Sequence, residues 1–133
     1  MDYFAYGSNL SKKQMLERCP SAKPGFSAVL PNYKLIFTGW SRTLKGATAT
    51  LKPMRGERVS GGVWQMEERD LQRLDRYEGY PTEYNRFNVL VITDDGEGVK
   101  AFTYIKNRPG DEGKPSPEYL ATIRQGYKDW GIE

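Results

Sequence analysis

The order of apolar and polar residues predicts short strands separated by a few helices. Residues 2–7 alternate loosely, are rich in aromatic side chains and are typical of a first strand. A short helix is expected over 11–18, because Pro20 prevents its continuation. Further strand-like runs follow on either side of Pro31-Asn32 within 26–40, over 47–51, and over 59–66, where Gly61-Gly62 indicates a bulge or a close backbone approach.

The second half of the chain is predicted to hold two helices and one hairpin. Apolar spacing and flanking signals indicate a helix over 67–78. Residues 84–93 and 99–106 are expected to pair around a turn rich in Asp and Gly. Ser116 is expected to cap a last helix that begins at Pro117.

This pattern predicts the fold class α+β. Strands outnumber helices and hairpins dominate, so we expect a sheet curled toward a barrel. The length of 133 residues favours a single domain over 1–133. Hydrophobic residues make up 38% and charged residues 28%, which is within the usual range of soluble proteins.

Composition excludes several kinds of chemistry. The chain has no histidine and one cysteine, Cys19. A Ser-His-Asp triad, a Cys-His pair, a His-ligated metal, an internal disulfide and a multi-Cys zinc site are therefore excluded. A reducing, cytoplasmic setting is expected, and the sequence shows neither a signal peptide nor a stretch long enough to span a bilayer. The net charge of +3 comes from scattered basic residues, which favours small acidic ligands over nucleic acid.

The predicted helix over 67–78 carries an acid on its apolar stripe. Leu71, Leu74 and Glu78 lie at i, i+3 and i+7 and share one face, so Glu78 is expected to point inward. It also lies in the last turn, where a negative charge opposes the helix dipole. Desolvation and the dipole both raise its pKa, which predicts a proton shuttle near neutral pH. The alternative is a frayed helix end at which Glu78 pairs with Arg76 or Arg86.

A Gly-Ser-Asn turn between the first strand and the first helix is a candidate anion site. The first N–H groups of a helix have no internal partners, and Gly7 lets a ligand approach the backbone. Ser8 and Asn9 are expected to cap the helix or to bond the ligand. An ordinary structural turn is the alternative, and no lysine follows at the spacing of a nucleotide-binding P-loop.

Two segments carry a resemblance to a known family. They are Tyr3-Phe4-Ala5-Tyr6-Gly7-Ser8-Asn9-Leu10 and Leu74-Asp75-x-x-Glu78-Gly79, with Gly61-Gly62-Val63-Trp64-Gln65-Met66 and Ser116-Pro117-Glu118-Tyr119 at fitting positions. In order and spacing the whole chain resembles the γ-glutamylcyclotransferase-like superfamily. The resemblance implies a small mixed, mostly antiparallel β-barrel with flanking helices. It also implies that the substrate's γ-glutamyl head binds at Tyr6, Gly7, Ser8, Asn9 and Leu10, and that Glu78 is the catalytic base.

The implied reaction, of a lyase or acyltransferase, releases 5-oxoproline and a free amine from a γ-glutamyl amide. Glu78 would remove a proton from the substrate's own α-amine and return it to the leaving amine. Backbone N–H groups near Gly7 to Leu10 would bind the α-carboxylate or the developing oxyanion. This chemistry needs no metal and no cofactor. The leaving group stays open between an amine, an amino acid, glutathione and a γ-glutamyl group on a carrier protein.

Other residues and other functions are weighed against this interpretation. Tyr84, Tyr104 and Tyr119 are candidates to line the pocket, with core tyrosines as the alternative. Arg86 would orient a carboxylate or form a salt bridge on a strand surface. Ser8 as a covalent nucleophile lacks a visible base. The alternative function is a non-catalytic binding module for an acidic or γ-glutamyl metabolite. Binding of single-stranded nucleic acid is disfavoured because 17 acidic residues lie among 20 basic ones.

Overall fold

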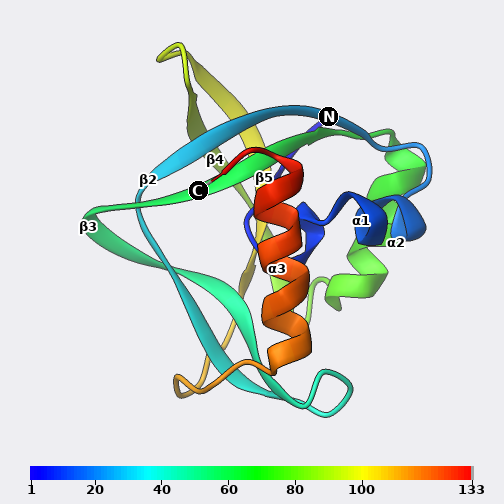
Figure 1. The fold of residues 1–133 in the computed structure, drawn as a ribbon, viewed down its shortest axis with the longest axis vertical. Helices are drawn as coiled ribbons and strands as arrows, with labels where there is room; N and C mark the ends of the chain where they lie inside the picture. Colours follow the sequence, from blue (N-terminus) through cyan, green and yellow to red (C-terminus); the bar gives the residue numbers. More distant parts are fainter. Residues whose placement is uncertain (133) are drawn as a thin grey trace.

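The computed structural model describes residues 1–132 and shows a closed barrel flanked by helices (Figure 1). The elements are β1 (Asp2–Ala5), η1 (Ser8–Leu10), α1 (Lys12–Arg18), β2 (Lys23–Ser41), β3 (Gly46–Gln65), α2 (Glu68–Glu78), β4 (Tyr84–Thr93), β5 (Gly98–Lys106) and α3 (Pro117–Asp129). The strand order is β1-β3-β2-β4-β5, and β5 closes on β1 in parallel while the other neighbours are antiparallel. The predicted α+β class and mixed, mostly antiparallel barrel are confirmed.

The long hairpin of β2 and β3 differs from the predicted series of short strands. The sequence pattern predicted two runs on either side of Pro31-Asn32, but β2 continues through both residues. Asn32 adopts a left-handed conformation with φ 65°, and the register shifts between Pro31 and Tyr33. The Asn32 side chain accepts a hydrogen bond from the Gly56 amide of β3 at 3.1 Å. A bulge thus absorbs the interruption, so one bent strand replaces the two predicted runs.

The core has two parts, which together place the helices. One fills the barrel and includes the fully buried Phe4, Val63 and Val91. The other lies between β1 and the helices α1 and α2, which lie side by side next to the barrel (Figure 1), and includes Met15 and Leu74. Among the described residues, no helix has the length and apolarity needed to cross a membrane.

Gly61-Gly62 marks a close backbone approach. The ladder between β2 and β3 runs through both residues in regular register, so no bulge forms there. A β-carbon on Gly62 would lie 2.6 Å from the indole of Trp130. The absence of a side chain at Gly62 therefore lets the residue after α3 pack directly on the barrel wall.

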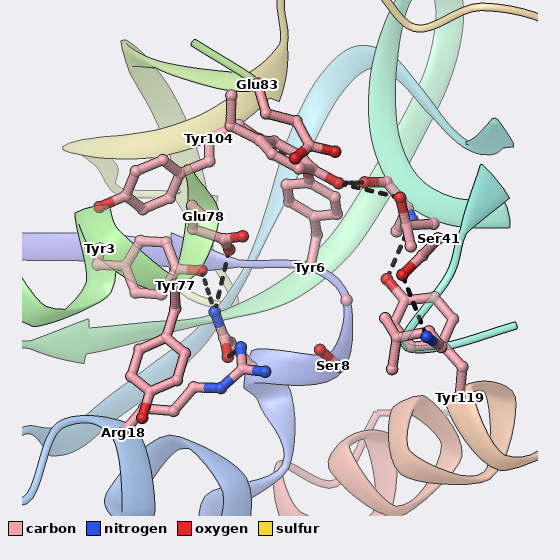
Figure 2. A pocket seen from close by; sticks show the side chains of 16 residues that line it. Tyr3, Tyr6, Ser8, Arg18, Ser41, Tyr77, Glu78, Glu83, Tyr104 and Tyr119 are labelled. Atoms are coloured by element: carbon pink, nitrogen blue, oxygen red, sulfur yellow. Dashed lines mark hydrogen bonds between the residues drawn. The ribbon is translucent and has the colours of Figure 1, made fainter. Parts of the chain in front are cut away.

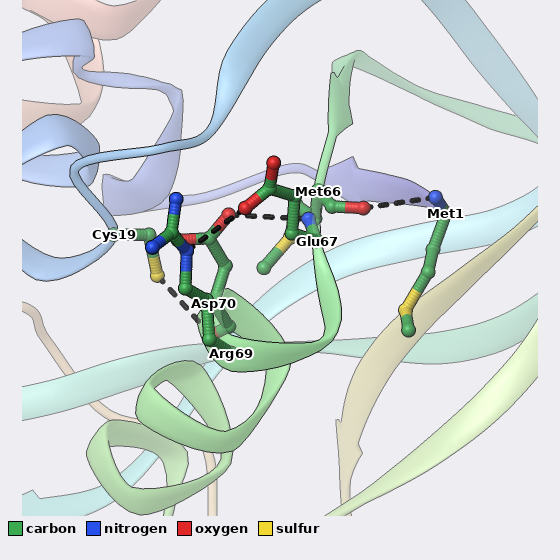
Figure 3. A network of polar contacts seen from close by, with 6 residues as sticks. All are labelled: Met1, Cys19, Met66, Glu67, Arg69 and Asp70. Atoms are coloured by element: carbon green, nitrogen blue, oxygen red, sulfur yellow. Dashed lines mark hydrogen bonds and ion pairs between the residues drawn. The ribbon is translucent and has the colours of Figure 1, made fainter.

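The start of α2 is held by a compact polar network (Figure 3). Glu67 and Asp70 form a capping box in which the Asp70 carboxylate accepts from the Glu67 amide at 3.1 Å. The Cys19 thiol donates to the Asp70 carbonyl at 3.4 Å, and the ammonium of Met1 donates to the Met66 carbonyl at 2.9 Å. These contacts tie the start of α2 to β1 and α1, and so fix the direction in which its last turn points.

Candidate active site

A pocket of about 170 Å³ lies where η1, the end of α2 and the barrel wall meet (Figure 2). The predicted turn residues Tyr6, Gly7, Ser8 and Asn9 line it together with the predicted acid Glu78. These residues are separated by about half of the chain and are brought together because β1 and α2 pack on the same core cluster. The predicted proximity of the turn and the acid is therefore present in the structure.

The position of Glu78 follows from the packing of α2. Leu74 is fully buried, and Glu78, one turn further on, is partly buried in the pocket wall. Gly79 ends the helix in a left-handed conformation with φ 66°, and its amide donates to the Arg76 carbonyl at 3.3 Å. The helix end is thus capped, and within residues 1–132 Glu78 pairs with neither Arg76 nor Arg86.

The environment of Glu78 changes its protonation. Burial raises the pKa of its carboxyl from an ordinary 4.5 to about 7, while the charge of Arg18 lowers this pKa and the nearby Glu83 raises it. A group with a pKa near 7 exchanges protons readily in both directions at neutral pH. The carboxyl therefore has the protonation behaviour expected of a general acid/base.

Asn9 holds this carboxyl in place (Figure 2). Its Nδ2 donates to Glu78 Oε1 at 3.3 Å and to the Tyr3 hydroxyl at 3.0 Å. Its Oδ1 accepts from Gln14 Nε2 at 3.2 Å and from Arg18 Nη1 at 3.0 Å. Because donors from α1 hold the amide oxygen, the NH₂ group must face the acid. Asn9 thus acts as an oriented hydrogen-bond donor to Glu78.

Leu10 lies apart from the other predicted turn residues. This side chain is fully buried in the core and does not line the pocket. The turn of η1 directs it inward, where its carbonyl accepts from Trp130 Nε1 at 2.8 Å and its amide donates to the Gly7 carbonyl at 3.1 Å. The neighbouring Asn9 carbonyl accepts from Trp64 Nε1 at 3.1 Å. Two tryptophans therefore hold the backbone of the turn from behind.

The predicted tyrosines line the pocket, but the hydroxyls of Tyr84 and Tyr119 form hydrogen bonds with the backbone of β3. Tyr84 donates to the Ala49 carbonyl at 2.7 Å, and Tyr119 accepts from the Ala49 amide at 3.0 Å. Tyr6 donates to the Tyr104 carbonyl at 2.6 Å. Burial raises the pKa of Tyr84 and raises that of Tyr119 to about 12, so neither hydroxyl ionises near neutrality.

Tyr104 and Arg86 belong to a cluster behind the pocket. The Tyr104 hydroxyl donates to Asp75 Oδ1 at 2.6 Å, so only other parts of this residue face the cavity. Arg86 Nε lies 3.5 Å from the same carboxylate oxygen, and its guanidinium lies over the Tyr80 ring at 4.1 Å. Of the two interpretations of Arg86, the structure contains the salt bridge.

The remaining candidate chemistry at the turn is limited. Ser8 Oγ accepts from Gln14 Nε2 at 2.8 Å, and in the described part of the chain no base contacts it. Three or more His, Cys, Asp or Glu side chains do not gather into a metal-binding group anywhere in residues 1–132. The arrangement therefore centres on Glu78 with the Asn9 donor beside it, and Glu83 is a second carboxylate in the pocket wall.

Comparison with known proteins decides the family. The family described as "Gamma-glutamyl cyclotransferase, AIG2-like" matches residues 3–130. The chain belongs to the γ-glutamylcyclotransferase family. The γ-glutamylcyclotransferase of Homo sapiens is 35% identical over 135 residues, covering 98% of this chain and 71% of that protein. The corresponding protein of Bos taurus is also 35% identical over the same share of each chain.

Solved structures agree with this family assignment. A structure described as γ-glutamyl cyclotransferase has a TM-score of 0.94 and 34% identity, covering 99% of this chain and 80% of that one. YkqA from Bacillus subtilis shares the fold at a TM-score of 0.83 and 24% identity, covering 100% of this chain and 49% of that one. The predicted family, fold class and cyclotransferase type of enzyme are confirmed.

Several residues in or beside the pocket of this γ-glutamylcyclotransferase family member were not predicted. Gln14 and Arg18 lie four residues apart on α1, and both reach back to the turn. Tyr3 contributes a hydroxyl from β1, and Tyr77 and Glu83 line the pocket beside α2. The i, i+4 spacing of two long polar side chains directly after the turn was the one local signal for the first pair.

Proposed function

We propose that Glu78 is the general acid/base with which this chain converts a γ-glutamyl amide to 5-oxoproline and a free amine. The observation that carries this proposal is the partly buried Glu78 carboxyl, with a pKa of about 7, held by Asn9 beside the Gly-Ser-Asn turn. Family membership supplies the type of reaction. The residue roles rest on the geometry and on general chemical principles.

The substrate carries its own nucleophile, the α-amino group of the glutamyl unit. This group is protonated near pH 7, so it must lose a proton before its nitrogen can bond to the γ-carbonyl carbon. Glu78 in its carboxylate form takes up that proton. As the five-membered ring forms and the original amide C–N bond breaks, Glu78 gives a proton to the departing nitrogen. Ring closure is favoured when the glutamyl chain is held folded in a small pocket.

The turn supplies candidate donors for the anionic part of the substrate. The amides of Leu10 and Ser11 are used internally, since they donate to the carbonyls of Gly7 and Ser8. The backbone amides of Ser8 and Asn9 take part in none of the backbone hydrogen bonds that form in the turns, loops and helix caps of residues 1–132. These two amides, at the pocket wall, are proposed to bind the α-carboxylate or the oxyanion that forms at the γ-carbonyl.

The proposal is tested by release of 5-oxoproline from γ-glutamyl-alanine, ε-(γ-glutamyl)-lysine, a γ-glutamyl-anilide and glutathione. Each is assayed with the wild type, with Glu78→Gln and with Glu68→Gln, a matched loss of one exposed carboxylate on the same helix. We expect turnover to be lost in Glu78→Gln and kept in Glu68→Gln. Wild-type turnover in Glu78→Gln would overturn the assigned role.

The same panel assigns the leaving group. A γ-glutamyl group on a carrier protein is proposed as the further substrate to test, because a chain with net charge +3 suits an acidic partner. Binding of γ-glutamyl compounds in calorimetry without any release of 5-oxoproline would replace the enzyme by a binding module.

A further inference from the structure

A second, more open groove adjoins the active-site pocket. Its volume is about 470 Å³, and it is lined by Glu17, Arg18, Arg73, Arg76 and Tyr77. We call it the arginine groove. Arg18 and Tyr77 also line the active-site pocket, so the two hollows share a wall. A substrate that extends beyond the pocket across this wall enters the arginine groove.

The arginine groove has an excess of positive charge. Its lining includes three arginines and one acidic residue, Glu17. Within residues 1–132 the ion pairs join Arg69 to Glu67 and Arg86 to Asp75. Neither ion pair includes an arginine of the groove. Unpaired guanidinium groups that converge on one groove are suited to bind carboxylates, which they contact through two parallel hydrogen bonds.

The charge of the groove is partly fixed at the border with the pocket (Figure 2). The Arg18 guanidinium lies over the Tyr77 ring at 4.8 Å, while its Nη1 donates to Asn9 Oδ1. Arg73 and Arg76 are exposed and lie three residues apart on α2, so they share one helix face. One cation thus stands at the entrance and two more lie outward along α2.

We infer that the arginine groove binds carboxylates of the leaving group, so that the preferred substrates are γ-glutamyl conjugates of acidic amino acids or acidic peptides. The inference rests on the proposed function. Glu78 protonates the departing nitrogen, and Tyr77 is its neighbour in the shared wall. Groups attached to that nitrogen therefore leave the pocket on the side where Arg18, Arg73 and Arg76 lie. An uncharged amine would leave these cations without a partner.

The test compares two substrates of equal length that differ in one charge, γ-glutamyl-glutamate and γ-glutamyl-glutamine. We expect the wild-type kcat/KM to favour the glutamate conjugate by about two- to five-fold, in the range of exposed ion pairs. The double variant Arg73→Gln/Arg76→Gln is expected to lose this preference. Arg69→Gln removes one charge from the same helix outside the groove, and is expected to keep it. Higher salt should reduce the preference as well.

Equal kcat/KM for the two conjugates in the wild type would overturn the inference, and so would a preference that survives in the double variant. Failure of the proposed reaction is seen separately, as absence of 5-oxoproline from both conjugates. In that case calorimetry with Glu78→Gln measures the Kd of each conjugate. The inference is supported if the glutamate conjugate binds more tightly and if adding Arg73→Gln/Arg76→Gln removes that difference. Equal Kd values for the two conjugates contradict it.

Discussion

The Asn9 side-chain amide and the Glu78 carboxylate join two distant parts of the chain, with Nδ2 lying 3.3 Å from Oε1 across 69 positions of sequence. The amide comes from η1 and the acid from the last turn of α2. This bond occupies Oε1, so Oε2 is the oxygen that we assign to the substrate amine. The orientation of the acid therefore depends on contacts within the turn as well as on the helix that carries it.

Activity should depend on pH through Glu78. Burial raises its pKa to about 7, and only the carboxylate form accepts a proton from the substrate. We expect kcat/KM to rise as the pH increases through about 7, and to fall about tenfold for each unit below it. A pH–rate profile between pH 5 and 9 with a good substrate measures this limb. A flat profile across neutrality would contradict the role of Glu78 as base.

Ionisation of Glu78 should also affect stability, in the direction opposite to its effect on activity. In the unfolded chain Glu78 loses its proton near 4.5, whereas in the folded protein it keeps it until about 7. The folded state therefore binds more protons in this window, and the free energy of unfolding falls as the pH rises through it. Glu78→Gln does not titrate. It should be more stable than the wild type by about 1–3 kcal/mol at pH 8.

Urea unfolding of both proteins at pH 4 and pH 8 checks this second prediction. The advantage of Glu78→Gln is expected at pH 8 and should disappear at pH 4, where the wild-type acid is protonated in both states. A variant less stable than the wild type at pH 8 would show that the acid is not penalised by its burial.

Removal of the Arg18 charge should shift the activity profile. The positive charge lowers the pKa of Glu78 and Nη1 holds the Asn9 amide. Arg18→Met is therefore expected to move the acidic limb to higher pH and to reduce kcat/KM at pH 6 by about two- to ten-fold. Arg18→Lys keeps the charge and should keep the position of the limb. Identical profiles for the Met and Lys variants would exclude this electrostatic effect.

Gly126→Ala should reverse the usual effect of alanine in a helix. Alanine normally stabilises an interior helical position by about 1 kcal/mol relative to glycine. A β-carbon on Gly126 would lie 2.5 Å from Leu10 Cβ and 2.8 Å from the Ser11 amide nitrogen, so α3 must move away from the turn. We expect a loss of about 1–3 kcal/mol in the free energy of unfolding, together with a higher KM.

Thermal unfolding of Gly126→Ala beside Gly113→Ala tests this contact. A β-carbon on Gly113 would make only ordinary contacts, the nearest at 3.4 Å from Ala47 Cβ, so this variant should be close to the wild type. Equal stability of the two variants would mean that α3 does not press on η1.

Local rules were sufficient for features decided within one or two helical turns. The spacing of Leu74 and Glu78 correctly placed the acid on the helix face that packs on the core. Gly79 ends the helix in a left-handed backbone conformation, as its position in the sequence predicted. The Ser116 side chain accepts from the Tyr119 amide at 3.2 Å with Pro117 following it, as the sequence predicted. In these cases the backbone partner lies within a few residues of the side chain.

Features decided by tertiary contacts could not be predicted. The alternation of β5 does not reveal that Tyr104 directs its hydroxyl to Asp75 behind the pocket. Leu10 follows four pocket residues in sequence, but a single turn of η1 places it in the core. The Pro31-Asn32 pair separates two strand-like runs in the sequence, and nothing local shows that the partner strand accommodates a bulge there.

The bond between Trp130 Nε1 and the Leu10 carbonyl joins residues 120 positions apart. Closing a loop of this length costs chain entropy before the contact can form, so α3 is expected to dock on the turn late in folding. Until α3 has docked, Leu10 and Ser11 lack the helix that packs on them. The backbone of the turn beside the pocket is therefore expected to reach its final position in one of the last steps of folding.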